Sequence, residues 1–449
     1  MEAGNDACNP RLKDSLVLGF ALFAMFFGAG NLIFPPTLGL ESGEAWPLGL
    51  AGFLLTDVGL ACLGIYAVNA AGGAVESIDA ALGNRPGLLL SGTAVVCLGV
   101  LFAMPRTAAT TYEMAIVPYL GASVPLLPFS LAFFAIVFLL AMRESRIMDI
   151  IGKFFTPTLV LGVVLLVAVG IAAPLGAPGE PLSPTVFQDG VRAGYQTMDV
   201  LGVVSFSLVL MDSIRAYGYQ QRRSQLGIVV AASLVALALL ALLYGGLTYL
   251  GATAQGLDAG LPQGQLIVAV TYQLLGDPGV VVLGVVVALA CITTAVALVG
   301  STAAYFSKVS GGRLPYRWLL AADCAIGVVI CNIGLDGIVG FADPVLGAVC
   351  PPLVTVIVML LFHQRIRSRR AYQGAALAAL ASAVVIELSL YDALPLPLDW
   401  LPLYDLGFAW VPFAVLGGLV GWLVGKASRP RPSLAEAAAD GDGDGEGPA

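Results

Sequence analysis

The sequence predicts an all-α polytopic membrane protein, and this fold class rests on composition, on the length of the apolar runs and on the placement of charges. The chain of 449 residues is 58% hydrophobic and only 11% charged, whereas a soluble domain is typically about a quarter charged. The apolar residues fall into runs near the ~20 residues that a helix needs to cross a bilayer. We predict about twelve transmembrane helices, over residues 14–38, 46–70, 87–118, 126–142, 149–173, 191–217, 226–252, 265–305, 316–333, 337–361, 370–390 and 402–425. The eighth span is expected to include an irregular entry segment around residues 256–277.

Lysine and arginine lie almost entirely in every second loop between these runs. Of the 21 basic residues, only Arg106 and Arg192 fall outside this pattern, and the alternate loops are acidic. Because basic loops stay on the cytoplasmic side, the pattern predicts a multi-pass protein of the cytoplasmic (inner) membrane with both termini in the cytoplasm. The expected partners are the lipid bilayer and a small-molecule substrate, with no nucleic acid.

Two of the apolar runs are interrupted at mid-depth by glycine and polar residues. Span one contains Gly28-Ala29-Gly30-Asn31, and span six contains a polar, glycine-containing stretch over residues 194–202. Lipid cannot satisfy the backbone groups of a broken helix, so both breaks must line a cavity inside the protein. Paired interruptions in corresponding positions indicate an inverted-repeat transporter.

Each repeat has five spans, so the second copy starts from the opposite side of the membrane. The predicted segments are a cytoplasmic N-terminus (1–13), a first five-helix repeat (14–173), an inverted second five-helix repeat (191–361), helices 11 and 12 (370–425) and an acidic cytoplasmic tail (428–449). Disorder is expected in the tail because its hydrophobicity is low.

The break in span one has the features of an anion-binding site. A half-helix that begins near Asn31 would direct free N–H groups and the positive end of its dipole into the cavity, and glycine permits close approach of the backbone. Gly28, Ala29, Gly30 and Asn31 are therefore the first candidates for substrate binding. The alternative is that these glycines only let two helices pack closely.

Asp199 is the main candidate in the break of span six. An isolated carboxylate inside a membrane span is energetically expensive and indicates a functional site. Asp199 is therefore expected to face a substrate ammonium or a cation, unless it only caps the second half of its own helix. Thr197 and Gly202 are further candidates in the same break.

Four stretches of the sequence resemble one transporter family. They are FALFAMFFGAGNLIFPPTLGL in span one, LFAMPRTAATTYE in span three, GYQTMDVLG in span six and ALACITTAVAL in span eight. Over about residues 12–422 the chain is similar to the branched-chain amino acid:cation symporter family (the BrnQ type). The resemblance implies a LeuT-type fold of five-plus-five inverted repeats with helices 1 and 6 broken and two extra helices. It also implies that a cation gradient drives the import of leucine, isoleucine and valine.

A sodium site is a further implication of this resemblance. The stretch ACITT at residues 290–294 is similar to the Ala-x-x-Thr-Ser/Thr motif of span eight in LeuT-type transporters. The implied Na⁺ ligands are oxygens of Ala290, Thr293 and Thr294 together with carbonyls of Ala24 and Phe27 in span one. Threonine in a membrane helix often bonds back to its own backbone instead.

The remaining candidates would line or support the cavity. Arg106 and Glu113 are seven residues apart in span three, near one helical face, and are expected to form a gating or structural pair because a buried arginine needs a partner. Phe102 and Phe206 are candidates for an apolar pocket around the substrate side chain. One methylene in such a pocket is worth only ~1–3 kcal/mol, so leucine, isoleucine and valine should compete.

Three alternatives stay open at this point. Proton coupling could replace sodium, and it would need a titratable group such as Asp57, Asp199 or Asp343. The substrate could be another small amino acid or solute, or the protein could sense an amino acid without moving it. The sequence has no catalytic triad, metal cluster or phosphate loop, so neither an enzyme activity nor a cofactor is expected.

Overall fold

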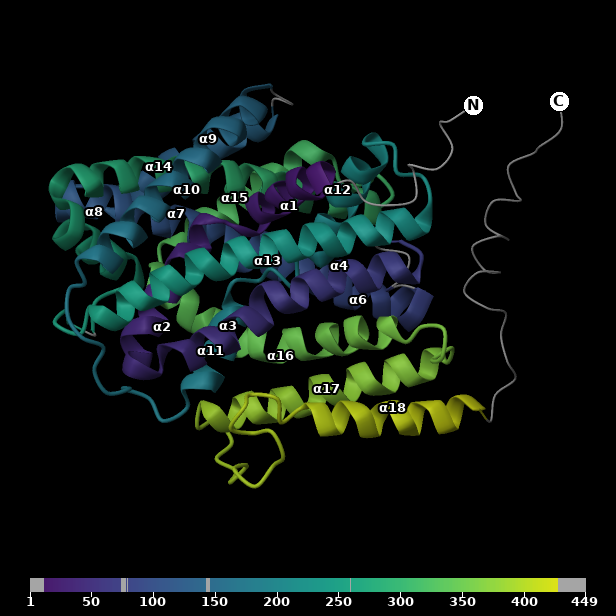
Figure 1. The fold of residues 1–449 in the computed structure, drawn as a ribbon. Coiled ribbons are helices and arrows are strands. Elements are labelled where there is room, and N and C mark those ends of the chain that lie inside the picture. The colour runs from purple at the N-terminus through teal and green to yellow at the C-terminus, as the bar shows by residue number, and fades with distance from the viewer. Residues whose placement is uncertain (1–11, 74–77, 79, 143–145, 259, 427–449) are drawn as a thin grey trace, which may run out of the picture.

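The computed structural model describes residues 12–73, 78, 80–142, 146–258 and 260–426. The predicted N-terminal segment before residue 12 and the predicted acidic tail lie outside the described residues. The regular elements of the described chain are helices, and the long ones run roughly parallel to one another across the molecule (Figure 1). The predicted all-α fold is confirmed.

The helices follow the predicted spans in order along the chain. In the first half they are α1 (Leu12–Phe26), α2 (Phe34–Ser42), α3 (Trp46–Leu54), α4 (Leu60–Ala71), α6 (Asn84–Val95), α7 (Ala103–Thr111), α8 (Val117–Leu120), α9 (Leu126–Met142) and α10 (Arg146–Ala172). In the second half they are α11 (Val186–Gln196), α12 (Val203–Ala216), α13 (Arg222–Thr253), α14 (Gln263–Val309), α15 (Tyr316–Cys331), α16 (Leu335–Leu361), α17 (Arg369–Leu390) and α18 (Val411–Lys426).

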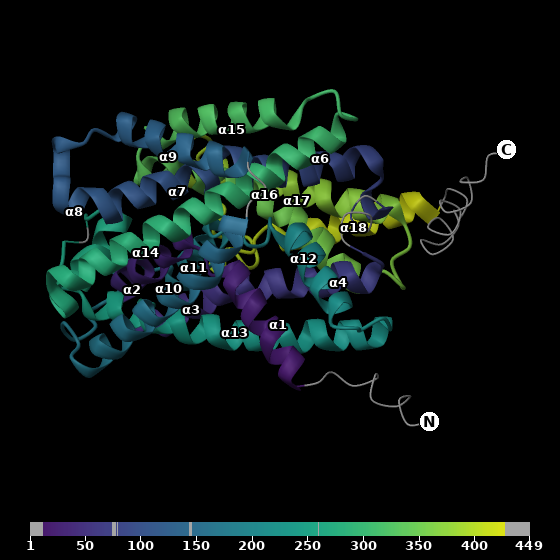
Figure 2. The same ribbon diagram turned by 90° about the horizontal axis from the view of Figure 1, so that it is seen from above.

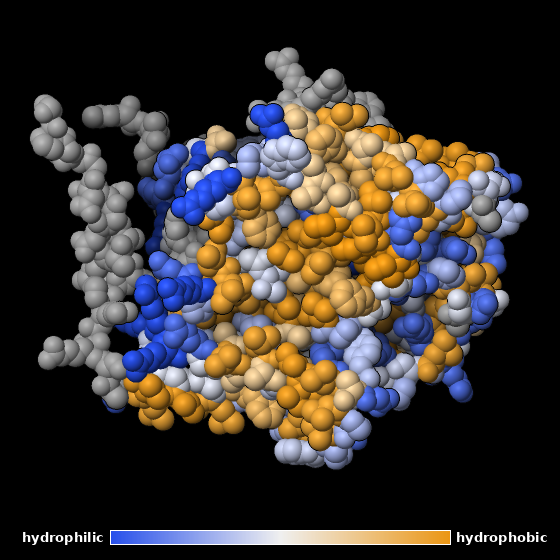
Figure 3. Space-filling model, turned by 180° about the vertical axis from the view of Figure 1, so that it is seen from behind, coloured by the Kyte–Doolittle hydropathy of each residue, from blue (hydrophilic) through white to orange (hydrophobic). Residues whose placement is uncertain are grey.

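The surface and the helix lengths both suit a membrane. Among the described residues, six helical stretches are long and apolar enough to cross a bilayer: Phe34–Ala71, Asn84–Leu120, Arg222–Thr253, Gln263–Val309, Leu335–Leu361 and Arg369–Leu390. Shorter apolar helices accompany them, and the number of twelve spans stays a prediction. In Figure 3 hydrophobic residues cover the broad middle of the face shown, and hydrophilic residues gather toward its two ends.

Helices 1 and 6 are broken where the sequence predicts. The 3₁₀ turn η2 (Ala29–Leu32) separates α1 from α2, and residues 197–202 separate α11 from α12. Within the second break Met198 is fully buried and has a φ of 65°. A non-glycine residue in this left-handed region is under strain, which is typical of functional sites.

Spans two and three contain π-helical turns that the sequence analysis did not predict. They are η4 (Leu55–Gly59) between α3 and α4, η5 (Val96–Leu101) before α7, and η6 (Tyr112–Ile116) after α7. A π turn adds one residue to the helical repeat and is frequently found at functional sites. Each turn therefore changes which residues share a face downstream of it.

Glycines bring the half-helix α2 against α13. A Cβ on Gly39 would lie 1.9 Å from the Thr248 carbonyl oxygen, and one on Gly251 would lie 1.9 Å from the Pro36 carbonyl oxygen. The contact of α11 with α3 is equally close. Seen from above (Figure 2), α15 lies at one edge of the molecule and α13 at the opposite edge, with α11 and α16 between them. The backbone approach allowed by glycine thus holds the broken helices in the interior.

Two predicted boundaries need correction. The twelfth helix begins at Val411 rather than at residue 402, because Leu403 and Gly407 have positive φ angles that a helix does not accept. In span eight, where an irregular entry over residues 256–277 was expected, α14 is already helical from Gln263 and is interrupted only at Gly276. The last helices, α17 and α18, pack on each other and on α16 along one side of the molecule (Figure 1).

The close approach of α2 and α13 can be tested with Gly251→Ala. The added methyl group would clash with the Pro36 carbonyl, and overpacking typically costs about 1–3 kcal/mol of unfolding free energy. We expect a lower melting temperature in detergent. Gly340→Ala in α16 is the matched control, since a Cβ there meets no heavy atom within 4 Å, and its melting temperature should be unchanged or higher. Equal melting temperatures for both variants would contradict the assignment.

Candidate functional site

The side chain of Asn31 joins the two helix breaks. It is 4% exposed. Its Nδ2 donates to the Phe26 carbonyl at 2.8 Å, to Oδ2 of Asp199 at 3.3 Å and to the Tyr244 hydroxyl at 3.1 Å. One amide therefore links the end of α1, the break between α11 and α12, and the middle of α13.

A second carboxyl meets this group from the π turn η4. The hydroxyl of Thr197 donates to Oδ1 of Asp57 at 2.8 Å and to the Gly194 carbonyl at 2.7 Å. The same Thr197 hydroxyl accepts from the Asp199 backbone N–H at 3.5 Å, so it joins Asp57 to Asp199. Asp57 is fully buried and Asp199 is 7% exposed, so two acidic groups lie side by side in the protein interior.

Arg106 of α7 supplies the positive charge at this place. It is 3% exposed, and its Nη1 donates to the Gln196 carbonyl at 2.7 Å. The guanidinium also lies 5.1 Å from the centre of the Phe34 ring and acts electrostatically on Asp199. Because Gln196 is the last residue of α11, its carbonyl belongs to the negative end of that half-helix. Arg106 thus caps the broken helix rather than simply facing solvent.

The expected pair of Arg106 with Glu113 does not form. Glu113 instead lies beside Gly264 and Leu335, and a Cβ on Gly264 would come within 2.7 Å of its Oε2. The prediction assumed an uninterrupted α-helix, in which residues seven apart share a face. The π turn η6 begins at Tyr112 and rotates Glu113 away from that face.

The residues predicted to bind sodium lie around the first break and in α14. Ala24 is exposed on α1, whereas Phe27 is 4% exposed and its ring stacks on that of Phe23 at 5.3 Å. The turn η2 packs against α14. In α14 Ala290, Thr293 and Thr294 are half-buried, and the Thr293 hydroxyl donates to the Ala290 carbonyl at 2.8 Å. That carbonyl retains a second lone pair.

The residues predicted to bind substrate divide into two groups. Gly28 is extended, with φ −95° and ψ 161°, and accepts a 3.0 Å bond from the Asn31 backbone N–H; Ala29 and Gly30 lie in η2. At the second break Gly202 and Phe206 touch, since a Cβ on Gly202 would be 2.5 Å from the Phe206 ring.

The two candidate aromatic residues are placed differently. The ring of Phe206 is 5.2 Å from that of Phe26, edge to face, so it adds an apolar surface where the breaks meet. Phe102 is fully buried and packs edge to face on Phe341 of α16 at 5.7 Å. Sequence reasoning did not find Tyr244, although a tyrosine in the middle of the apolar run of span seven, which also holds Tyr249 near its end, was a usable signal.

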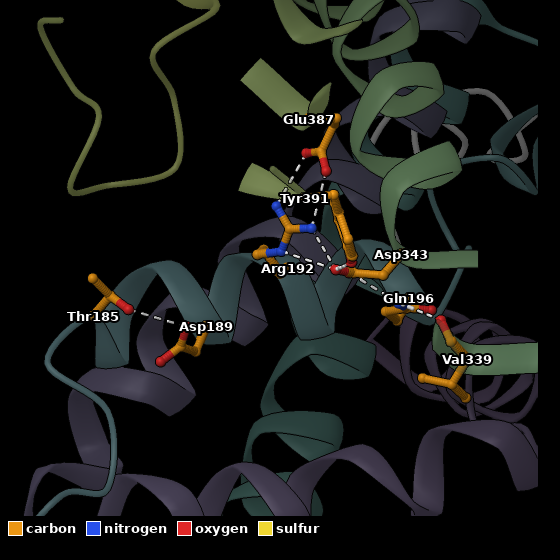
Figure 4. A network of polar contacts seen from close by, with 8 residues as sticks. All are labelled: Thr185, Asp189, Arg192, Gln196, Val339, Asp343, Glu387 and Tyr391. Atoms are coloured by element: carbon orange, nitrogen blue, oxygen red, sulfur yellow. Dashed lines mark hydrogen bonds and ion pairs between the residues drawn. The ribbon is translucent and has the colours of Figure 1, made fainter. Parts of the chain in front are cut away.

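A second polar network lies along the C-terminal half of α11 (Figure 4). Arg192 donates to both carboxylate oxygens of Glu387 on α17 at 3.0 Å, and it forms a salt bridge with Asp343 of α16. Asp343 also accepts from the Tyr391 hydroxyl at 2.6 Å and from Nε2 of Gln196 at 3.0 Å. A bidentate pair of arginine and carboxylate fixes orientation as well as charge.

Gln196 therefore belongs to both networks. Its side chain donates to Asp343, and its backbone carbonyl accepts from Arg106. By contrast, Asp212 and Arg215 of α12 form only a surface contact at 3.8 Å between two exposed side chains.

The family of the chain follows from its sequence along nearly its whole length. A family model described as "Branched-chain amino acid transport protein" matches residues 11–428. The chain belongs to this family. Its members are transport proteins rather than enzymes.

Individual relatives are similar over most of both chains. The branched-chain amino acid permease BraB of Bacillus subtilis is 32% identical over 92% of this chain and 96% of its own. The branched-chain amino acid transport system 2 carrier protein of Pseudomonas aeruginosa is 34% identical, over 89% and 93%. The branched-chain amino acid permease BrnQ of Escherichia coli is 33% identical, over 89% and 93%.

Solved structures confirm the LeuT-type architecture. The inward-facing conformation of Mhp1 superposes with a TM-score of 0.67 at 16% identity and covers 97% of each chain. MhsT in complex with L-phenylalanine gives a TM-score of 0.53 at 15% identity, over 91% of this chain and 98% of its own. At these identities the likeness concerns the fold.

The role of Asn31 can be measured through stability. Asn31→Ala leaves Oδ2 of Asp199 without its donor and the Phe26 carbonyl with only the Gly28 N–H, and an unsatisfied buried polar group costs about 1–3 kcal/mol of unfolding free energy. We expect a clear fall in the melting temperature of the purified protein. Asn332→Ala is the matched control: Asn332 makes two hydrogen bonds but is exposed, so its loss should change little. An equal fall in both variants would argue against a special role for Asn31.

Proposed function

We propose that the protein is a secondary active symporter that imports leucine, isoleucine and valine together with Na⁺ by alternating access. The observation that carries this proposal is the meeting of both broken helices at Asn31 and Asp199. Half-helix ends and unwound backbone at mid-membrane are where LeuT-type transporters bind substrates and ions. The names of the relatives support branched-chain amino acids as the substrate class.

In this proposal, the substrate binds between the two breaks. Its carboxylate lies against the backbone of Gly28, Ala29 and Gly30, near the start of the second half-helix, where the dipole favours negative charge. Its ammonium group faces Asp199, and Thr197 holds that break in place. The aliphatic side chain packs on Phe206 over Gly202, which gives an apolar surface without a polar group to select among the three amino acids.

Sodium binds between span one and α14. Its ligands are the carbonyls of Ala24, Phe27 and Ala290 with the hydroxyls of Thr293 and Thr294. The Thr293 hydroxyl can rotate from the Ala290 carbonyl toward the ion, because hydroxyl orientation adapts to its partner. Sodium favours import only if it stabilises the substrate-competent arrangement of the break more than the empty one.

In this proposal both termini lie in the cytoplasm, on the side of the basic loops. Arg106 serves as a structural residue at the gate, where it keeps the end of α11 beside the substrate. Glu113 serves a separate structural role, where span three packs against α14.

The direct test is uptake of radiolabelled leucine into proteoliposomes. We expect uptake under an imposed Na⁺ gradient and not under a pH gradient alone, with isoleucine and valine as competitors. If a solute of a different class competed with leucine and valine did not, the proposed substrate class would be wrong. Uptake driven only by a pH gradient would contradict the proposed sodium site.

The sodium ligands can be tested with Thr293→Ala combined with Thr294→Ala. Losing two ligands should raise the Na⁺ concentration needed for half-maximal uptake by about tenfold or more, which corresponds to ~1.4 kcal/mol or more of binding free energy. Thr271→Ala is the matched control, since Thr271 also lies on α14 and donates to its own backbone at Ile267. An unchanged Na⁺ requirement in the double variant would refute the assignment.

A further inference from the structure

The two buried carboxyls, Asp57 and Asp199, cannot both be ionised in the arrangement that the structure shows. An ionised carboxylate only accepts hydrogen bonds, and two carboxylates in contact at a buried site repel each other strongly. The Thr197 hydroxyl joins the two residues, since it donates to Oδ1 of Asp57 at 2.8 Å and accepts from the Asp199 backbone N–H at 3.5 Å. A proton shared by the two carboxyls relieves their repulsion.

The partners of the individual oxygens support the same conclusion. Oδ1 of Asp57 accepts from Thr197, and Oδ2 of Asp199 accepts from Asn31. Among the described residues no donor reaches Oδ2 of Asp57, although this atom is inaccessible to solvent. Buried polar atoms are almost always satisfied. A proton on this pair would provide the missing hydrogen bond.

The charges around the pair also balance with one proton. The titratable or charged groups that face the pair from neighbouring elements are Arg106 of α7, Tyr244 of α13 and Cys62 of α4. Only Arg106 is cationic. Two carboxylates and one arginine leave a net charge of −1 in a buried place, where an unpaired charge is costly. One shared proton makes the group neutral.

We propose that Asp57 and Asp199 form a proton-binding site whose single proton is taken up and released during the transport cycle. On uptake a carboxylate oxygen gains the proton from a hydronium ion and becomes a carboxylic acid that donates to its neighbour. On release the O–H bond breaks, water takes the proton, and the carboxylate remains. The site is separate from the sodium position between span one and α14.

The placement of the pair connects this proton to conformational change. Asp57 lies on the π turn η4 and Asp199 in the break of span six, so each carboxyl sits at an irregular point of a different span. Any movement of one break relative to η4 changes the distance between the carboxyls. Together they hold the proton, and when they separate each is free to ionise.

The test uses Asp57→Asn in the full-length protein, reconstituted in liposomes. The asparagine amide can accept from Thr197 and donate to Asp199, so it imitates the protonated pair without titrating. Asp323→Asn is the matched control, because Asp323 is buried on α15 and its two carboxyl oxygens have no hydrogen-bond partner among the described residues. Asp57→Glu, which keeps a titratable group, should preserve wild-type behaviour in part.

The first readout needs no substrate. Subtracting the infrared spectra of Asp57→Asn from those of the wild type over a pH series should leave a titrating protonated-carboxyl component. The same subtraction made in the Asp323→Asn background should leave it too. Spectra of Asp57→Asn that titrate in the same way as those of the wild type would overturn the proposal. If Asp57→Asn does not yield folded protein, Asp199→Asn is measured in the same way and must also lose the component.

The second readout is leucine uptake at saturating Na⁺, and it rests on the proposed function. In the wild type and in Asp323→Asn the rate should fall as pH rises beyond the loss of the shared proton, by up to about tenfold per pH unit for a single proton. In Asp57→Asn the rate should not depend on pH. A wild-type rate that is independent of pH overturns the proton site. An absence of leucine uptake alongside the expected infrared result would overturn the proposed substrate and leave the proton site standing.

Discussion

The structure depends on satisfying two backbone carbonyls that the broken helices leave open inside the membrane. A helix that stops at mid-depth cannot use water or lipid to pair its last carbonyls. At the end of α1 the Phe26 carbonyl accepts from the Asn31 side chain, and at the end of α11 the Gln196 carbonyl accepts from Arg106. In both cases a buried side chain from outside the half-helix completes it, Asn31 from beyond the break and Arg106 from α7.

The cap provided by Asn31 depends on the close packing of the surrounding helices. Asn31 reaches Asp199 and Tyr244 only because α2 lies against α13 at glycine contacts. Larger residues at Gly39 or Gly251 would separate the helices and move the amide away from its partners. The glycines therefore set the distance between α2 and α13, and the hydrogen bonds of Asn31 depend on that distance.

The sequence predicted the two breaks well because their signal is local. Glycine and polar residues in the middle of an apolar run are unusual, and the cost of an unsatisfied backbone in lipid makes their meaning nearly unambiguous. The pairing of Arg106 with Glu113 failed because it assumed a regular helix, and the π turn at Tyr112 carries no comparable local signal. The start of the twelfth helix was predicted too early for a similar reason. The positive φ angles that precede the helix arise only in the folded loop and leave no local signal in the sequence.

Contacts between distant parts of the chain were the least predictable. Arg192 was recognised as an exception to the charge pattern, but its partners Asp343 and Glu387 are 151 and 195 residues away. Periodicity cannot specify such pairs, because they follow from how α16 and α17 pack on α11. The link between Asp57 and Asp199 through Thr197 is of the same kind: each carboxyl was a candidate, and only the fold brings them together.

Gln196 makes the two polar networks mechanically dependent on each other. Its side chain is held by Asp343 of α16, and its carbonyl is held by Arg106 of α7. Through Arg192 the same half-helix is tied to Glu387 of α17. A displacement of α11 that breaks the contact with α17 must therefore also shift the carbonyl that orients Arg106. Since Arg106 provides the positive charge beside Asp199, the position of the last helices of the chain acts on the electrostatics of the buried carboxyl pair.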